Sequence, residues 1–102
     1  MTNNKAPESP PDFLVHDDVD SVGVIVVEKS TAGQTLTGWV IDTDETITVD
    51  AIDDIPLGHK IALTDLSDGD KVIKYGFPIG RTVASVSKGG HVHVHNTKTE
   101  KW

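Results

Sequence analysis

The segment 37-TGWVIDTDETITVDAI-52 alternates apolar and polar residues in the manner of a β-hairpin. In its second half, apolar residues occupy every second position from Ile47 to Ala51, and threonine or aspartate fills the positions between them. This period of two is typical of a strand with one buried face and one solvated face. Asp44 stands in the middle, and aspartate is common in tight turns. We therefore predict two antiparallel strands, 37–43 and 45–52, joined through Asp44.

The rest of the chain has the same rhythm, with short apolar runs and turn signals alternating about every 8–12 residues. No window of a dozen residues keeps a period of 3.6, so we expect little helix, at most one turn near 62–66. No internal repeat is evident. The sequence thus predicts a mostly β fold, with 67–70 as a turn and 77–80 as a bend. Further strands are predicted at 13–16, 21–29, 71–76 and 81–86, and in the segment that starts at His91.

Length and composition limit the domain organisation. The 102 residues are enough for one domain but not for two. Residues 1–11 are polar and rich in proline, which favours a disordered lead-in, and we place the single domain at 12–102. The chain has no cysteine, which excludes disulfides, thiolate metal sites and cysteine nucleophiles.

The charge of the chain restricts its partners. Sixteen acidic residues against nine basic ones leave a net charge of −7, and no basic stripe is present. Nucleic acid is therefore not an expected partner, because binding it requires cations that displace phosphate counterions. The apolar runs are too short to cross a bilayer, and the N-terminus lacks the apolar part of a signal peptide. We expect a cytoplasmic protein that does not bind membranes.

The histidines of 91-HVHVHN-96 are the first candidate site, because the chain has only five histidines in all. On an extended strand, residues two apart share a face, so His93 could share a metal ion with either His91 or His95. All three could not bind one ion while extended, since His91 and His95 would be about 13 Å apart. The alternative is an edge strand with histidine outside and Val92 and Val94 in the core. The pattern leaves both interpretations open.

Two further histidines are candidates. His59 and Lys60 follow a Pro/Gly bend, and in a loop both side chains could reach one anion; the alternative is an exposed polar loop. His16 ends a predicted strand just before two aspartates, where an ordinary hydrogen bond to a carboxylate is the simpler interpretation. The pair Gly89 and Gly90 could let a ligand approach the backbone or could form a tight hairpin.

Other chemistries have little support. The segment 76-GFPIG-80 lacks the lysine of a phosphate-binding loop, and no G-x-S-x-G element is present for a serine hydrolase. The aspartate pairs 17/18 and 53/54 are typical of solvated turns rather than of a paired acid and base.

Three segments resemble the small N-terminal module of the altronate and galactarate dehydratase family. They are 13-FLVHDDVDSVGVIV-26, 55-IPLGHKIALTDLSDGDKVIKYGFPIG-80 and 89-GGHVHVHNTKT-99, and they occur in the family's order. The family includes the free-standing small subunits of sulfolactate sulfo-lyases, which the segments resemble most. The resemblance implies a β-clip fold of the SAF type.

The resemblance also implies half of an enzyme, with a large catalytic (beta) subunit as the partner. The family reaction is β-elimination from a 2-hydroxy acid, which gives a 2-oxo acid. The H-V-H-x-H-N stretch and the short chain favour the branch that acts on (2R)-3-sulfolactate, with pyruvate and sulfite as products. The alternatives are an altronate-type dehydratase subunit and a non-catalytic module that binds a sugar acid or a metal.

The resemblance further implies a divalent metal, Fe²⁺ by family analogy, and a site at one mouth of the clip. We assign three roles on this basis. The expected catalytic residues are His16 and His59, the substrate-binding residues are Lys60, Arg81 and Asn96, and the metal ligands are His91, His93 and His95.

Overall fold

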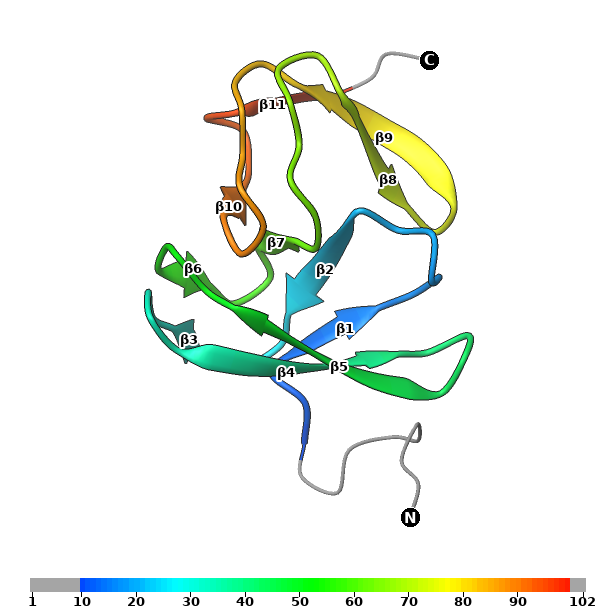
Figure 1. Ribbon diagram of the computed structural model, residues 1–102, viewed down its shortest axis with the longest axis vertical. Helices are drawn as coiled ribbons and strands as arrows, with labels where there is room; N and C mark the ends of the chain where they lie inside the picture. The colour runs from blue at the N-terminus through cyan, green and yellow to red at the C-terminus, as the bar shows by residue number, and fades with distance from the viewer. Residues whose placement is uncertain (1–9, 100–102) are drawn as a thin grey trace.

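The computed structural model describes residues 10–99, and in this range the chain is built from short strands without helix (Figure 1). The strands are β1 Phe13–Val15, β2 Val22–Ile25, β3 Lys29–Ser30, β4 Thr35–Val40, β5 Glu45–Asp50, β6 Ile55–Pro56, β7 Lys60–Ala62, β8 Lys71–Lys74, β9 Phe77–Thr82, β10 His91–Val92 and β11 Thr97–Thr99. The prediction of a mostly β fold is confirmed. The prediction of a helical turn near 62–66 was wrong, because these residues form no helix. No described segment forms a helix suited to crossing a membrane.

Most of the predicted disordered lead-in, residues 1–11, lies outside the described residues, so that prediction stays untested. The predicted hairpin is confirmed as β4 and β5, which pair antiparallel from Thr35 opposite Asp50 to Val40 opposite Glu45. The turn contains Asp44 at a φ of 57°, and its carboxylate accepts a hydrogen bond of 3.0 Å from the Trp39 indole nitrogen.

A six-stranded sheet in the order β10-β7-β2-β1-β4-β5 carries the fold, with β1 and β4 as its parallel pair. Successive residues of a strand point to opposite faces. Ile61 on β7 accordingly packs into one apolar core and Ala62 into another. The first core contains Phe13, Val15, Ile25, Leu36, Val40, Val49, Ala51, Ile55 and Ile61. The second contains Val22, Ala62, Leu66, Val72, Val86 and Val92. Burial on both faces explains why β7 is apolar at successive positions.

Two arms, residues 62–72 and 82–92, lie side by side as the two long loops at the top of Figure 1. Each residue of the second arm corresponds to the residue 20 positions earlier in the first arm. Leu66 and its equivalent Val86 exchange two backbone hydrogen bonds, of 2.7 and 2.8 Å. The Gly69 amide donates to the Thr82 carbonyl at 2.9 Å, and in the second arm the Gly89 amide donates to the Ala62 carbonyl at 2.8 Å. The arms therefore form a pseudo-twofold pair.

The pseudo-twofold match is one of backbone structure, and the sequence shows no evident internal repeat. The clearest pattern that the two arms share is apolar-Ser-x-Gly, in 66-LSDG-69 and 86-VSKG-89, which is too short to stand out in the sequence. What they have in common is a backbone conformation. Gly69 and Gly89 have φ values of 91° and 89°, and residues 67–70 and 87–90 close equivalent turns with hydrogen bonds of 3.0 and 2.8 Å.

The predicted bend at 77–80 was also wrong, because these residues belong to β9. The reversal falls one step earlier, at Tyr75 and Gly76, whose φ values are 57° and 74°. The buried Asp20 carboxylate accepts hydrogen bonds from both amides, at 3.0 and 2.8 Å, and so holds the turn from 55 residues away. Pro78 is tolerated in the strand because it lies beside a register shift between β8 and β9.

Candidate functional site

The histidine segment is a strand over only two residues, which corrects the prediction of a longer one. β10 ends at Val92, and the chain then turns back through 93–96 into β11. Val92 is buried in the second core, as expected, but Val94 is 78% exposed and does not face the core. The alternation of valine and histidine therefore does not describe one continuous strand.

The side chain of Asn96 holds this turn. Its Oδ1 accepts a hydrogen bond of 3.0 Å from the His93 amide, and its Nδ2 donates one of 2.7 Å to the His91 carbonyl. Asn96 is nearly buried, and one amide side chain thus satisfies two backbone groups. We predicted this residue as a substrate ligand. That role remains a prediction, whereas the structure shows Asn96 positioning the two histidines.

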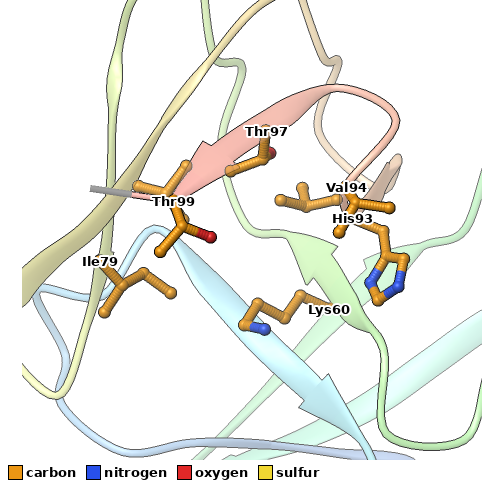
Figure 2. A pocket seen from close by; sticks show the side chains of 8 residues that line it. Lys60, Ile79, His93, Val94, Thr97 and Thr99 are labelled. Carbon is orange, nitrogen blue, oxygen red and sulfur yellow. The ribbon is translucent and has the colours of Figure 1, made fainter. Parts of the chain in front are cut away.

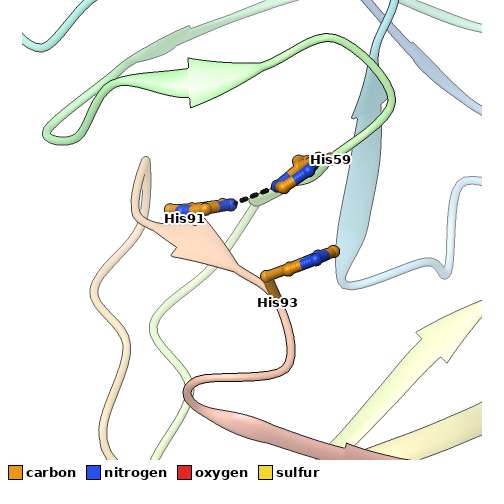
Figure 3. Close-up of side chains that lie close together, drawn as sticks. All are labelled: His59, His91 and His93. Carbon is orange, nitrogen blue, oxygen red and sulfur yellow. Dashed lines mark hydrogen bonds between the residues drawn. The ribbon is translucent and has the colours of Figure 1, made fainter.

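The turn brings His91 and His93 against His59, which reaches them from the loop before β7 (Figure 3). The Nδ1 atom of His59 lies 2.8 Å from Nε2 of His91, so one of the two nitrogens donates a hydrogen bond. The ring of His93 stacks on that of His59 with centroids 3.8 Å apart. His59 therefore makes close contact with both histidines of the C-terminal segment.

His95 also lies near the cluster, because the chain is not extended there. Its ring centroid is 4.9 Å from that of His91. The separation of about 13 Å between the two histidines holds for an extended strand, and it does not apply here because the strand ends at Val92. The convergent nitrogens nevertheless belong to a different trio. The ligand atoms of His59, His91 and His93 all lie within 4.8 Å of one another, and His95 is outside this group.

Crowding keeps part of this cluster uncharged. Burial is the largest influence that lowers the pKa of His91 below its ordinary value of 6.5. Positive charge on the neighbouring rings lowers it further, and only the carboxylate of Asp53 acts in the other direction. Desolvation and positive neighbours, Lys60 among them, also lower the pKa of His93. Both rings are thus neutral near pH 7, which is the form that binds a metal or accepts a proton.

The trio of His59, His91 and His93 fits a divalent transition metal. Imidazole suits iron, zinc, nickel and copper, and three protein ligands leave coordination positions open for a substrate. Two nitrogens on one tetrahedral ion lie about 3.4 Å apart. The 2.8 Å contact between His59 and His91 would therefore open slightly, and its hydrogen bond would be replaced by bonds to the ion. His95 as a ligand remains a prediction.

Asp53 also positions the cluster. Its carboxylate accepts a hydrogen bond of 2.9 Å from the His91 amide, while Asp54 accepts one of 2.8 Å from the Ala32 amide. We interpreted this aspartate pair as a solvated turn, and both carboxylates accept hydrogen bonds from backbone amides. The sequence held no signal that Asp53 would meet a residue 38 positions away.

The remaining predicted residues lie apart. His16 sits in a second hollow, where its ring packs on Tyr75 with centroids 4.2 Å apart. The His16 carbonyl, just after β1, accepts a hydrogen bond from the Asp42 amide, whereas the His59 carbonyl accepts one from the Ile25 amide, opposite Phe13 at the other end of β1. The expected common mouth therefore does not include His16. Arg81 is exposed on β9, in register between Lys71 and Lys98. Only Lys60 borders the cluster, in a hollow that His93 also lines.

The sequence-family model of the altronate/galactarate dehydratase SAF domain matches residues 11–100 of the chain. The chain belongs to this family. The predicted family is therefore confirmed, and the β-clip of the SAF type describes the pair of arms and the sheet that supports them.

Curated relatives of this SAF domain fall into two groups. The chain is 56% identical over 91 residues to the (2R)-sulfolactate sulfo-lyase subunit alpha of Chromohalobacter salexigens, which covers 89% of this chain and 97% of the relative. It is 57% identical over 49 residues to the protein of the same name from Paracoccus pantotrophus, covering 48% of this chain and 73% of the relative. The altronate dehydratase of Bacillus subtilis is 51% identical over 53 residues, covering 52% of this chain but 11% of the relative.

Proposed function

We propose that this chain is the small subunit of a two-subunit lyase that converts (2R)-3-sulfolactate into pyruvate and sulfite. The observation that carries the proposal is the combination of the histidine trio with a relative, named as subunit alpha of that lyase, that matches over 97% of its own length. A name that includes "subunit alpha" implies a partner subunit. We propose that a large catalytic (beta) subunit supplies the rest of the active site.

The proposed reaction is an elimination across C2 and C3. A base removes the proton from C2, the C3–S bond breaks, and the sulfur leaves with the bonding electrons as sulfite. The resulting enol of pyruvate takes up a proton at C3 and loses the proton of its hydroxyl group to become the 2-oxo acid. Charge develops on the substrate carboxylate and on the sulfonate during this step, so a site for it needs cations and a neutral base.

His59, His91 and His93 are the residues that would hold a divalent metal, which we propose as Fe²⁺. A bound metal would supply Lewis acidity towards the substrate carboxylate and the 2-hydroxyl group. A nitrogen that holds a metal cannot also accept a proton. We therefore assign proton transfer at C2 to His95, which lies beside His91 but outside the trio. This exchanges the roles first expected for His59 and His95.

An altronate-type dehydratase is the second candidate, because the B. subtilis altronate dehydratase is 51% identical over its aligned 53 residues. In that reaction water rather than sulfite leaves from C3. The aligned part is 11% of that enzyme, whereas the subunit alpha relative is nearly the length of this chain. We therefore rank the sulfolactate reaction first.

Co-expression of the chain with the large subunit of the lyase tests the proposal. We expect sulfite release from sulfolactate by the complex, none by the chain alone, and no dehydration of altronate. His59→Gln in the small subunit should abolish turnover and metal content together while the complex still forms in gel filtration. Altronate dehydration without sulfite release would establish the second candidate instead, and full turnover by His59→Gln would refute the role of the trio.

A further inference from the structure

A hollow beside the histidine cluster carries one further inference. Its volume is about 130 Å³, which is the space of about four water molecules. It lies between β7, β9 and the turn that connects β10 to β11 (Figure 2). The lining residues are Lys60, Val72, Ile79, Val92, His93, Val94, Thr97 and Thr99.

The hollow has the charge of an anion site in an otherwise acidic protein. Among the described residues, Lys60 is the one lysine or arginine in its lining, and none of them lines it with a carboxylate. Within residues 10–99, the structure shows no ion pair or hydrogen bond for the Lys60 ammonium group. Val72, Ile79 and Val92 form an apolar wall, and an apolar surrounding strengthens the attraction between an ammonium group and an anion.

Threonine hydroxyls provide further donors. Figure 2 shows the Lys60 nitrogen and the Thr99 hydroxyl oxygen on the same side of the hollow. The Thr99 hydroxyl makes no hydrogen bond within the described residues, whereas that of Thr97 donates a weak one of 3.2 Å to Asn96. An oxyanion bound here would thus meet an ammonium group and a free hydroxyl, and the charged hydrogen bond is the stronger of the two.

The hollow opens onto the cluster. His93 lines it and stacks on His59 at 3.8 Å, and the Lys60 side chain lies across the hollow, with its nitrogen turned away from His93 (Figure 2). A small molecule with its anionic end at Lys60 would therefore extend towards the histidines. The volume of the hollow suits one such end group together with one or two carbons.

We propose that this hollow binds the sulfonate group of the substrate, with Lys60 and Thr99 as its ligands. The identity of the substrate rests on the proposed function, but the capacity of the hollow to bind a sulfonate does not. The three oxygens of a sulfonate can accept from both donors at once. Lys60 would also balance the charge that builds up on the sulfur group as the C3–S bond breaks, so the hollow would select a sulfonate over a neutral hydroxyl at C3.

Methanesulfonate is the probe for this subsite. We expect its addition to the full chain to shift the backbone amide NMR signals of Val92, Thr97 and Thr99, while uncharged dimethyl sulfone shifts none of them. Lys60→Met keeps the aliphatic stem and removes the charge, and it should weaken binding about 10-fold or more. Thr99→Val, a nearly isosteric change on an edge strand, should weaken it by a smaller factor.

Lys71→Met is the matched control, because it removes the same charge from an exposed position on β8 and should leave binding unchanged. Three results of the binding assay would overturn the subsite: no shifts in the hollow, equal losses in Lys60→Met and Lys71→Met, or acetate binding as tightly as methanesulfonate. In the two-subunit enzyme, Lys60→Met should raise the KM for sulfolactate. An unchanged KM would refute the subsite but not the proposed function. Methanesulfonate binding without sulfite release from sulfolactate would refute the proposed function but not the subsite.

Discussion

Gly89→Ala should destabilise the fold far more than Gly69→Ala, although both glycines occupy equivalent turns of the two arms. Their φ values, 89° and 91°, are nearly the same, so the conformational cost of a Cβ atom, about 1–2 kcal/mol, should be shared. Their surroundings differ. A Cβ at Gly69 meets no atom within 4 Å, whereas at Gly89 it would lie 2.0 Å from the Asp50 carbonyl oxygen.

Relief of that clash requires a shift of more than about 1 Å between the second arm and β5, since ordinary contacts exceed about 3 Å. The shift would break the 3.0 Å hydrogen bond from the Ile52 amide to the Gly89 carbonyl. Overpacking of about 1–3 kcal/mol and a lost hydrogen bond of about 1 kcal/mol add to the shared cost. We therefore expect about 1–2 kcal/mol for Gly69→Ala and about 3–6 kcal/mol for Gly89→Ala.

Urea denaturation followed by the fluorescence of Trp39 measures both changes. A difference of at least about 2 kcal/mol should separate the two unfolding midpoints by at least about 1 M, for a slope of about 1–2 kcal/mol per molar urea. Equal midpoints for the two variants would refute the close approach of Gly89 to β5 as the reason for glycine there. A larger loss for Gly69→Ala would refute the equivalence of the arms as well.

Three further predictions concern the cluster. Asn96→Ala removes the two side-chain hydrogen bonds to the His91 and His93 backbone and should lower the free energy of unfolding by about 2–4 kcal/mol in the same urea assay. A loss under about 0.5 kcal/mol would contradict its role in the turn. Because the pKa values of His91 and His93 are lowered in the folded state, the unfolded chain binds more protons just below pH 6.5. The urea midpoint should therefore be constant above about pH 7 and fall as the pH falls through 6.5. A variant with glutamine at both His91 and His93 that keeps the full pH dependence would disprove this cause. Cobalt titration followed by visible absorption should show loss of binding in His59→Gln and wild-type binding in His16→Gln, and equal behaviour of the two variants would contradict the trio.

The sequence predicted the β4–β5 hairpin well because its signal is local. The period of two from Ile47 to Ala51 and an aspartate at the turn are sufficient to define two paired strands. The bend placed at 77–80 failed for the opposite reason. Tyr75 adopts a φ of 57° because Asp20, far away in the sequence, accepts hydrogen bonds from the turn, and no local pattern reports such a partner.

The residue types of the candidate site were visible in the sequence, but their grouping was not. Spacing alone paired His91 with His93 or His93 with His95, since it assumed an extended strand. The side chain of Asn96 ends that strand and turns the segment, and the loop before β7 brings His59 against it. His59 therefore joins the trio in place of His95, from 32 positions away.

By itself, the sequence determined the all-β character, the family and the set of histidines, because these depend on local periodicity and on residue identity. Only the tertiary structure decided which histidines converge, which lysine faces a hollow and why the two arms match. Those features depend on hydrogen bonds between residues distant in the chain, such as those between Leu66 and Val86, and these form only when the two arms pack together.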